Sequence, residues 1–376
     1  MPVHVFELPS GTVRIDTHVP KSELTSLCQV GQRINPKRPF LFISTVLGRH
    51  LPVSPSMMNR SFQQLADAMD VSNAKDILVC GMAETAVGLG AGVYRALSHK
   101  ADHVRYLSST RHPMEGVPVM CEFSEQHSHA TDHFIQTFQG QPGALKQVDT
   151  LVLVDDEATT GNTFLNLFNA LYQSELSNVK QVFLVTLTDW SNGTCVQAIR
   201  DLGINCDNVT LLAGQWSFDK NPQFDMPELP SERWPAEQPA PILETSTACR
   251  YGLDSTMPCV PPQLKLDEAD TIRAGERIHV LGCGEYVWHP FLLAEQLEAA
   301  GAEVTFSATT RSPVLPIGPI DSKAIFKDNY GMGIYLYAHN IPDVDRLIIC
   351  SDTAAEHWDQ EWIQSIHHAK VIVHGK

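Results

Sequence analysis

Short apolar runs alternate with segments of helical periodicity between about residue 40 and residue 215. Five runs have the length of a buried strand: 40–45, 77–80, 104–108, 151–154 and 182–188. Between them, apolar residues recur every three or four positions, which predicts amphipathic helices at 62–69, 87–97 and 164–171. Strands that alternate with helices predict an α/β fold on a parallel sheet, in which ligands bind at the carboxyl ends of the strands.

Residues 222–262 interrupt this pattern, because they carry nine prolines and little periodicity. Such a composition predicts an extended linker or strap. Apolar residues within it, including Trp234 and Leu253, would allow the segment to pack on a surface.

Beyond the linker the strand–helix pattern returns and partly repeats the first half. Three strand exits match in order, at offsets of 201, 200 and 196 residues: Gly81 and Gly282, Arg111 and Arg311, Asp155 and Ser351. This order indicates a duplicated or convergent α/β unit, with chance similarity of strand ends as the alternative. Ser351 and Glu356 replace an acid and a threonine of the first half, so we expect the second half not to bind the same anion.

Composition narrows the class of function. The hydrophobic and charged contents, 43% and 19%, are typical of a globular protein, and 376 residues suffice for two domains. The net charge of −16 argues against binding to nucleic acid or an anionic membrane. Nine cysteines without a CxxC pair indicate a reducing compartment, and neither a membrane span nor a signal peptide is apparent. We therefore expect a cytoplasmic protein.

The most informative stretch is LVLVDDEATTGNT, at residues 151–163. An apolar strand runs into Asp155 and Asp156, a loop of small and hydroxyl residues follows, and a helical pattern begins at Phe164. Loop amides, threonine hydroxyls and a helix N-terminus form an anion site, and the adjacent acids add hydroxyl recognition or magnesium binding. A ribose 5-phosphate needs this combination; the alternative is an ordinary strand–turn–helix junction with a capping residue.

This stretch closely resembles the signature with which type I phosphoribosyltransferases bind 5-phosphoribosyl 1-pyrophosphate (PRPP). The resemblance implies that Asp155 and Asp156 hold the ribose hydroxyls and Mg²⁺, the expected cofactor. It also implies that the following loop binds the 5-phosphate through Ala158, Thr159, Thr160, Gly161, Asn162 and Thr163.

A second cradle, for the pyrophosphate, is expected after the strand at 77–80. The candidates are Met82, Ala83 and Glu84, which precede a glycine-rich helix start. Taken alone, this segment is only a strand-to-helix turn. Its position in the sequence before Asp155 strengthens the prediction that it binds pyrophosphate. Arg111 is the best nearby cation, since a guanidinium fork suits phosphate, with a surface salt bridge as the alternative.

The polar segment 121–134 occupies the position of a closing loop and supplies the catalytic candidates Glu125, His127 and His129. Imidazoles can donate to a leaving phosphate or accept a proton near neutral pH. A zinc site and a solvated polar loop are the competing interpretations.

Three further candidates are assigned to the acceptor side. Arg49 and His50 lie in a loop punctuated by glycine and proline, and Arg311 follows a strand of the second half. A capped strand exit would explain the first two equally well, and a salt bridge would explain Arg311.

Together these features resemble the phosphoribosyltransferase family associated with tellurite-resistance (Ter) operons, whose C-terminal domain is named for a TRSP motif, here Thr310-Arg311-Ser312-Pro313. The resemblance covers roughly residues 27–215 and 262–370. It implies a parallel-sheet type I phosphoribosyltransferase fold with a second, smaller α/β domain. The expected order is a hood or lead-in segment at 1–60, a PRPP-binding domain at 61–220, the Pro-rich linker at 221–262 and the TRSP-type domain at 263–376.

The expected activity is transfer of ribose 5-phosphate from PRPP to a nitrogenous acceptor, with release of pyrophosphate. The operon association implies a nucleoside-like product. The partners would be PRPP and a small-molecule acceptor, with no nucleic acid and no membrane, and a homodimer remains open. The alternative is a PRPP- or nucleotide-sensing module, or a scaffold, without turnover. The His- and Glu-rich segment favours catalysis, since a sensor would not need it.

Overall fold

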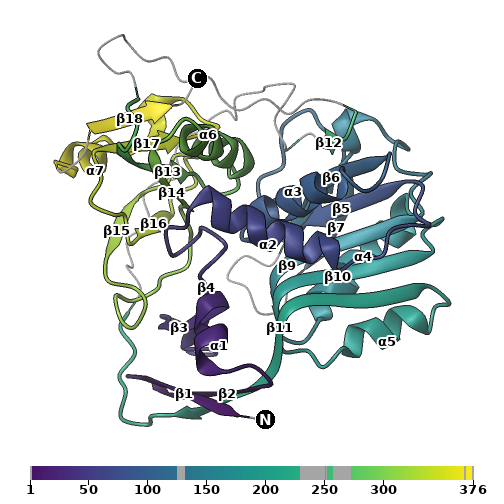
Figure 1. Ribbon diagram of the computed structural model, residues 1–376, viewed down its shortest axis with the longest axis horizontal. Coiled ribbons are helices and arrows are strands. Elements are labelled where there is room, and N and C mark those ends of the chain that lie inside the picture. Colours follow the sequence, from purple (N-terminus) through teal and green to yellow (C-terminus); the bar gives the residue numbers. More distant parts are fainter. Residues whose placement is uncertain are drawn as a thin grey trace. The chain divides into compact units, whose positions relative to one another are not determined.

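The structure is a computed structural model that describes residues 2–124, 132–228, 250, 252–256, 272–367 and 370–374. Its chain divides into two compact units, and Figure 1 shows the elements of each. The central unit comprises residues 59–215 and 245–260. The terminal unit comprises residues 1–58, 216–244 and 261–376.

The central unit is built on a sheet with strand order β11-β10-β9-β5-β6-β12. Neighbouring strands run parallel, except that β12 pairs antiparallel with β6. The predicted parallel sheet is thus confirmed. Its strands are β5 (Ile77–Gly81), β6 (Val104–Ser108), β9 (Thr150–Ala158), β10 (Gln181–Asp189), β11 (Asn205–Lys220), which passes into the terminal unit, and β12 (Leu253–Asp254).

Burial explains why the inner strands could be predicted from apolar runs in the sequence. All of β5 is buried, as is β9 from Thr150 to Val154, because helices cover both faces of a parallel sheet and its strands become continuous apolar runs. The edge strand β12 lies inside the predicted linker, and its Leu253 is 7% exposed. Part of the linker therefore packs on the sheet. Most of the remainder lies outside the described residues.

Helices α2 (Pro55–Asp67), α3 (Ala86–Leu97) and α4 (Asn162–Ser174) agree with the three predicted amphipathic segments, and a further helix is α5 (Thr194–Arg200). Helices α2 and α3 approach closely at Gly92, where a Cβ atom would lie 2.3 Å from the Phe62 ring. Within the described part of the chain, no helix has both the length and the apolar character to cross a membrane.

Strands occupy both ends of segment 121–134, so the prediction that all of it forms a closing loop is wrong. Val119–Ser124 (β7) and Asp132–Gln136 (β8) form a two-stranded antiparallel ribbon. A short 3-10 helix, η1 (Phe138–Gly140), follows β8. The three catalytic candidates Glu125, His127 and His129 lie between the two strands, outside the described residues.

The terminal unit contains a second parallel sheet, with strand order β14-β13-β17-β18. Its strands are β13 (Arg277–Gly282), β14 (Glu303–Ala308), β17 (Arg346–Cys350) and β18 (Lys370–His374). An antiparallel ribbon, β15 (Lys323–Lys327) with β16 (Tyr335–His339), lies between β14 and β17 in sequence. The helical elements are α6 (Trp288–Ala299), η4 (Ala355–His357) and α7 (Gln360–Ser365).

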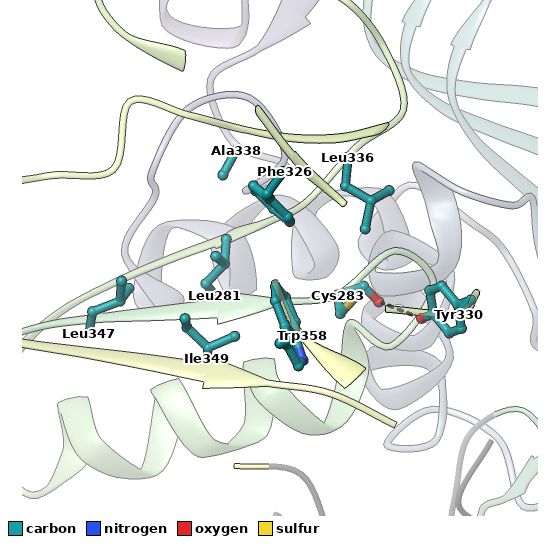
Figure 2. Close-up of a cluster of buried hydrophobic side chains, with 9 residues drawn as sticks. All are labelled: Leu281, Cys283, Phe326, Tyr330, Leu336, Ala338, Leu347, Ile349 and Trp358. Carbon is teal, nitrogen blue, oxygen red and sulfur yellow. Dashed lines mark hydrogen bonds between the residues drawn. The ribbon is translucent and has the colours of Figure 1, made fainter. Parts of the chain in front are cut away.

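One core of the terminal unit lies between this sheet and the ribbon. Figure 2 shows side chains from β13, β15, β16 and β17 gathered around Trp358, which is 2% exposed. The cluster consists of Leu281, Cys283, Phe326, Tyr330, Leu336, Ala338, Leu347, Ile349 and Trp358. It gives the C-terminal residues an apolar interior of their own.

The N-terminal residues belong to the same unit. Their elements are β1 (Val3–Leu8), β2 (Gly11–Thr17), α1 (Lys21–Leu27), β3 (Cys28–Gln32) and β4 (Phe40–Ser44). Strand β2 pairs with β1 and with β11. Ile43 of β4 packs with Val314 and Ile320, and Val53 pairs with Phe306 of β14. Residues 1–58 are therefore built onto the TRSP-motif half of the chain.

Strand 40–45 was expected in the parallel sheet, and that placement is wrong. Strand β4 instead pairs antiparallel with β3. A short turn joins the two, and in it the Asn35 side chain accepts from the Lys37 amide at 2.9 Å. A turn of this kind favours a local antiparallel partner, whereas an apolar run indicates a strand without naming its partner.

The predicted repeat is visible in the topology. The order β6-β5-β9-β10 in the central unit recurs as β14-β13-β17-β18 in the terminal unit. In each unit, counted along the chain, a helix follows the first of these strands, β5 or β13. An antiparallel ribbon follows the second strand, β6 or β14. Each ribbon is bridged to the exit of that second strand, through Thr110 and Phe134 in one unit and Thr310 and Tyr337 in the other.

We predict that Gly92→Ala destabilises the central unit, because the new methyl group would overlap the Phe62 ring. Overpacking of a core typically costs ~1–3 kcal/mol, which urea unfolding should detect. The matched variant Gly92→Ala with Phe62→Leu should recover part of that loss, since leucine vacates the ring plane. A stability equal to wild type in the single variant would mean that the helices separate without cost.

Candidate functional site

The acidic pair of the central unit lies where β9 leaves the core. Val154 is fully buried, whereas Asp155, Asp156 and Glu157 are partly exposed. The Asp156 amide donates to Asp155 Oδ1 at 2.9 Å, and Thr159 Oγ1 donates to Glu157 Oε1 at 2.8 Å. The strand thus delivers three carboxylates to its carboxyl end, the edge at which parallel sheets bind ligands.

The loop after the acids turns directly into helix α4. Gly161, at its N-cap, has φ of 79° and no side chain with which to cap the helix, and the Asn162 amide donates to Thr160 Oγ1 at 3.4 Å. A Cβ at Gly161 would also lie 2.6 Å from Cys195 Sγ, so both conformation and space favour glycine. The N-terminal amides of a helix without a capping side chain form an anion site that the helix dipole reinforces.

The loop after β5 is tied to β9. The Met82 amide donates to the Val154 carbonyl at 2.9 Å, and Thr85 Oγ1 donates to Asp156 Oδ1 at 2.7 Å. Met82 and Ala83 are buried, and the Ala83–Glu84 peptide bond is cis. The two candidate cradles are more than 70 residues apart in the sequence, and the structure places them side by side.

Arg111 lies beside the second cradle. Its Nε is 3.7 Å from Glu84 Oε1, and the two side chains are 7% and 14% exposed. The guanidinium is thus held next to the loop by one of the loop's own candidate residues. The salt bridge that competed with a phosphate-binding role exists, but within the site and not on the surface.

Thr85 ends the loop that the sequence indicated as the second cradle, but sequence reasoning missed another hydroxyl residue of this site, Ser109. Ser109 follows directly after β6, and its Oγ accepts from the Ala83 amide at 2.9 Å and contacts His133 Nδ1 at 3.0 Å. Its position immediately after a predicted strand was the available signal. Within the described ranges, no three His, Cys, Asp or Glu side chains cluster as a metal site would require.

The three acceptor-side candidates lie in the terminal unit. Arg49 is 2% exposed and donates through Nη1 to the Gly284 carbonyl at 2.9 Å and to the Thr309 carbonyl. Arg49 therefore joins the exits of β13 and β14. Arg311 is partly exposed and follows Thr310, the residue bridged to Tyr337.

His50 is buried beside His339, with ring centroids 5.4 Å apart. Burial, followed by the nearby His339, Arg49 and Arg33, holds the pKa of His50 well below its usual range. Burial likewise lowers the pKa of His339 to about 4. Both imidazoles are neutral at physiological pH, so His50 contributes no charge of its own to an anionic acceptor.

The equivalent strand end in the terminal unit is filled by the protein itself. Asp352 is buried and accepts from the Tyr330 hydroxyl at 2.9 Å, while Ser351 Oγ accepts from Asn329 Nδ2 at 3.1 Å. The first amides of α7 donate to the Asp359 side chain, which caps the helix. A carboxylate thus occupies the place that an anion would take.

The central unit brings an acidic pair, a helix N-terminus and a second loop together at the edge of a parallel sheet, an arrangement that points to a class of transferases. Residues 27–215 match the model of a phosphoribosyl transferase family. Residues 248–366 match the TRSP domain, described as C-terminal to that transferase domain. The chain belongs to this phosphoribosyl transferase family, as the sequence predicted. No curated protein matches the chain.

Solved structures of two kinds of phosphoribosyltransferase are similar to the chain. The adenine enzyme from Giardia lamblia, complexed with 9-deazaadenine, is 14% identical, with a TM-score of 0.36 over 50% of this chain and 96% of that one. The adenine enzyme from Trypanosoma brucei is 13% identical, with a TM-score of 0.36 over 56% and 87%. The orotate enzyme from Francisella tularensis is 16% identical, with a TM-score of 0.30 over 50% and 80%.

We predict that Thr85→Val weakens PRPP binding roughly tenfold, because Asp156 loses a hydrogen bond from a hydroxyl at 2.7 Å. Valine has nearly the same shape, so the loop should keep its fold. Thr85→Ser, which keeps the hydroxyl, is the matched control. Isothermal titration calorimetry with PRPP measures both, and equal affinities for the valine and serine variants would contradict the prediction.

Proposed function

We propose that the chain is a Mg²⁺-dependent phosphoribosyltransferase that transfers ribose 5-phosphate from PRPP to a nitrogenous acceptor and releases pyrophosphate. The observation that carries the proposal is the pairing of Asp155 and Asp156 with the N-terminus of α4, whose N-cap is a glycine. The hydrogen bond from Thr85 to Asp156 adds the second loop to the same site.

Each part of PRPP has a matching group. Carboxylate oxygens of Asp155 and Asp156 accept from the ribose hydroxyls, and residues 158–163 bind the 5-phosphate through amides and threonine hydroxyls. The loop Met82–Glu84 holds the pyrophosphate, with Arg111 beside it. Half-exposed carboxylates are the hard oxygen donors that Mg²⁺ prefers, so Asp155 and Asp156 fit that ion, which when bound would neutralise charge on the phosphates.

The reaction breaks the bond between C1 of ribose and a pyrophosphate oxygen, and forms a bond between C1 and a nitrogen of the acceptor. Positive charge develops at C1, as in other glycosyl transfers. The protein contributes by fixing donors around the departing pyrophosphate and by excluding water. The acceptor nitrogen loses its proton to a base, for which Glu125, His127 and His129 are the candidates.

The chemistry of the transfer identifies the class of acceptor and not a particular compound. A base or a base-like heterocycle fits the transfer, and the product would be nucleoside-like. The acceptor-side candidates Arg49 and His50 lose support, since Arg49 is committed to two carbonyl groups and His50 is neutral.

The test is calorimetric titration with PRPP in the presence of Mg²⁺, followed by assay of pyrophosphate release across a panel of purine, pyrimidine and pyridine bases. The proposal expects PRPP binding and turnover with at least one base. Absence of PRPP binding would overturn it. Binding without turnover of any base would instead favour a sensing role for the same site.

We predict that Asp155→Asn together with Asp156→Asn abolishes measurable PRPP binding while the circular dichroism spectrum stays unchanged. An amide removes the charge and one acceptor from each side chain. Because both side chains are partly exposed, the substitutions should not disturb the core. Retention of wild-type affinity would place the ribose elsewhere.

We predict that Thr160→Glu lowers PRPP affinity at least tenfold, because the new carboxylate would face the 5-phosphate. Thr160 is exposed, so the fold should tolerate the change. Thr160→Gln, of equal size and no charge, is the matched control and should bind more tightly than the glutamate variant. Equal affinities would show that charge at this position is irrelevant.

A further inference from the structure

A buried histidine lies behind the second cradle. His133, in β8, is 1% exposed, and its ring stacks on Phe123 of β7, with centroids 4.6 Å apart and planes inclined by 16°. Its Nδ1 is 3.0 Å from Ser109 Oγ, which in turn accepts from the Ala83 amide at 2.9 Å. A chain of two hydrogen bonds therefore runs from the ribbon to the loop after β5.

The direction of these bonds follows from burial. Ser109 is fully buried, so its hydroxyl hydrogen needs an acceptor. The oxygen already accepts from Ala83, and His133 Nδ1 is the acceptor within reach. The hydroxyl thus donates to Nδ1, and the imidazole carries its proton on Nε2. In this arrangement the histidine fixes the rotamer of the serine that holds the loop.

The second copy of the fold separates what is structural here from what is functional. There Thr309 Oγ1 accepts from the Gly284 amide at 2.8 Å, the counterpart of the bond from Ala83 to Ser109. The Thr309 hydroxyl donates to Cys283 Sγ at 3.9 Å, and no imidazole is needed. Holding the loop after the first strand with a hydroxyl is therefore common to both copies.

The histidine is specific to the copy with the acidic pair. Since Phe134 and Tyr337 make equivalent bridges, the counterpart of His133 is Leu336, which is 2% exposed in the apolar core of Figure 2. The scaffold thus accepts leucine at this position. A buried imidazole in a place where leucine suffices for the fold points to a role in the site.

We propose that His133 is a positioning residue for the pyrophosphate loop: through Ser109 it fixes Ala83, and so orients the following peptide of Glu84 and Thr85 toward the leaving group. Because His133 belongs to the ribbon of β7 and β8, it also couples that ribbon to the loop. This inference rests on the proposed function.

The test is His133→Leu in the full chain, with three ligands titrated separately in the presence of Mg²⁺: pyrophosphate, PRPP and ribose 5-phosphate. Affinity for pyrophosphate and PRPP should fall roughly tenfold, the effect of one lost buried hydrogen bond. Affinity for ribose 5-phosphate should stay within about twofold, since the chain of bonds through His133 and Ser109 ends at Ala83, in the loop after β5.

Two serine variants and one surface variant complete the experiment. Ser109→Ala should reproduce the loss, and combining it with His133→Leu should add little, because both remove the same chain of bonds. Ser109→Thr, which copies Thr309, should bind pyrophosphate more tightly than Ser109→Ala. His99→Leu, at an exposed histidine after α3, is the matched control for loss of an imidazole.

The outcomes distinguish the inference from the function on which it rests. Equal loss for all three ligands would mean that His133 acts on the fold in general, and no loss for pyrophosphate would mean that it does not position the loop. Either result overturns the inference while the transferase proposal stands. If the wild-type chain binds neither PRPP nor pyrophosphate, both fail together.

Discussion

The hydrogen bond from the Met82 amide to the Val154 carbonyl extends the pairing of β5 and β9 by one residue beyond the end of β5. The rest of the site depends on that extension. It fixes where the loop after β5 leaves the sheet, so that Thr85 meets Asp156 and Ala83 meets Ser109. Two loops from distant parts of the sequence become one site because their strands are neighbours in register.

Sequence reasoning recovered the parts of the fold that burial records directly. Strands β5, β9 and β10 are apolar because they are covered on both faces, and the acids at 155 and 156 end such a run. Partners were harder to predict. Strand β4 pairs with a neighbour in sequence and not with the parallel sheet, and the strands β7 and β8 are polar enough to resemble a loop. The contact between Ser109 and His133 spans 24 residues and leaves no periodic trace.

The two copies of the fold differ in how the carboxyl end of the third strand is filled. Both place a hydroxyl under the loop after the first strand and a bridge between ribbon and second strand. They differ at the helix that follows the third strand. In the central unit the N-cap of α4 is a glycine, whereas in the terminal unit the N-cap Asp359 accepts from two amides of α7 and Asp352 is bonded to Tyr330. A few polar differences thus leave one strand end open and fill the other with internal contacts.

The terminal unit is assembled from both ends of the chain, and this has a consequence for its folding. Arg49 donates to carbonyl groups 235 and 260 residues further along, at Gly284 and Thr309. During synthesis, the central unit can complete its sheet from nearly contiguous sequence, while β3 and β4 must wait for most of the chain to emerge. The hairpin of β3 and β4 is therefore exposed without these partners while most of the chain is being made, as is the loop that carries Arg49.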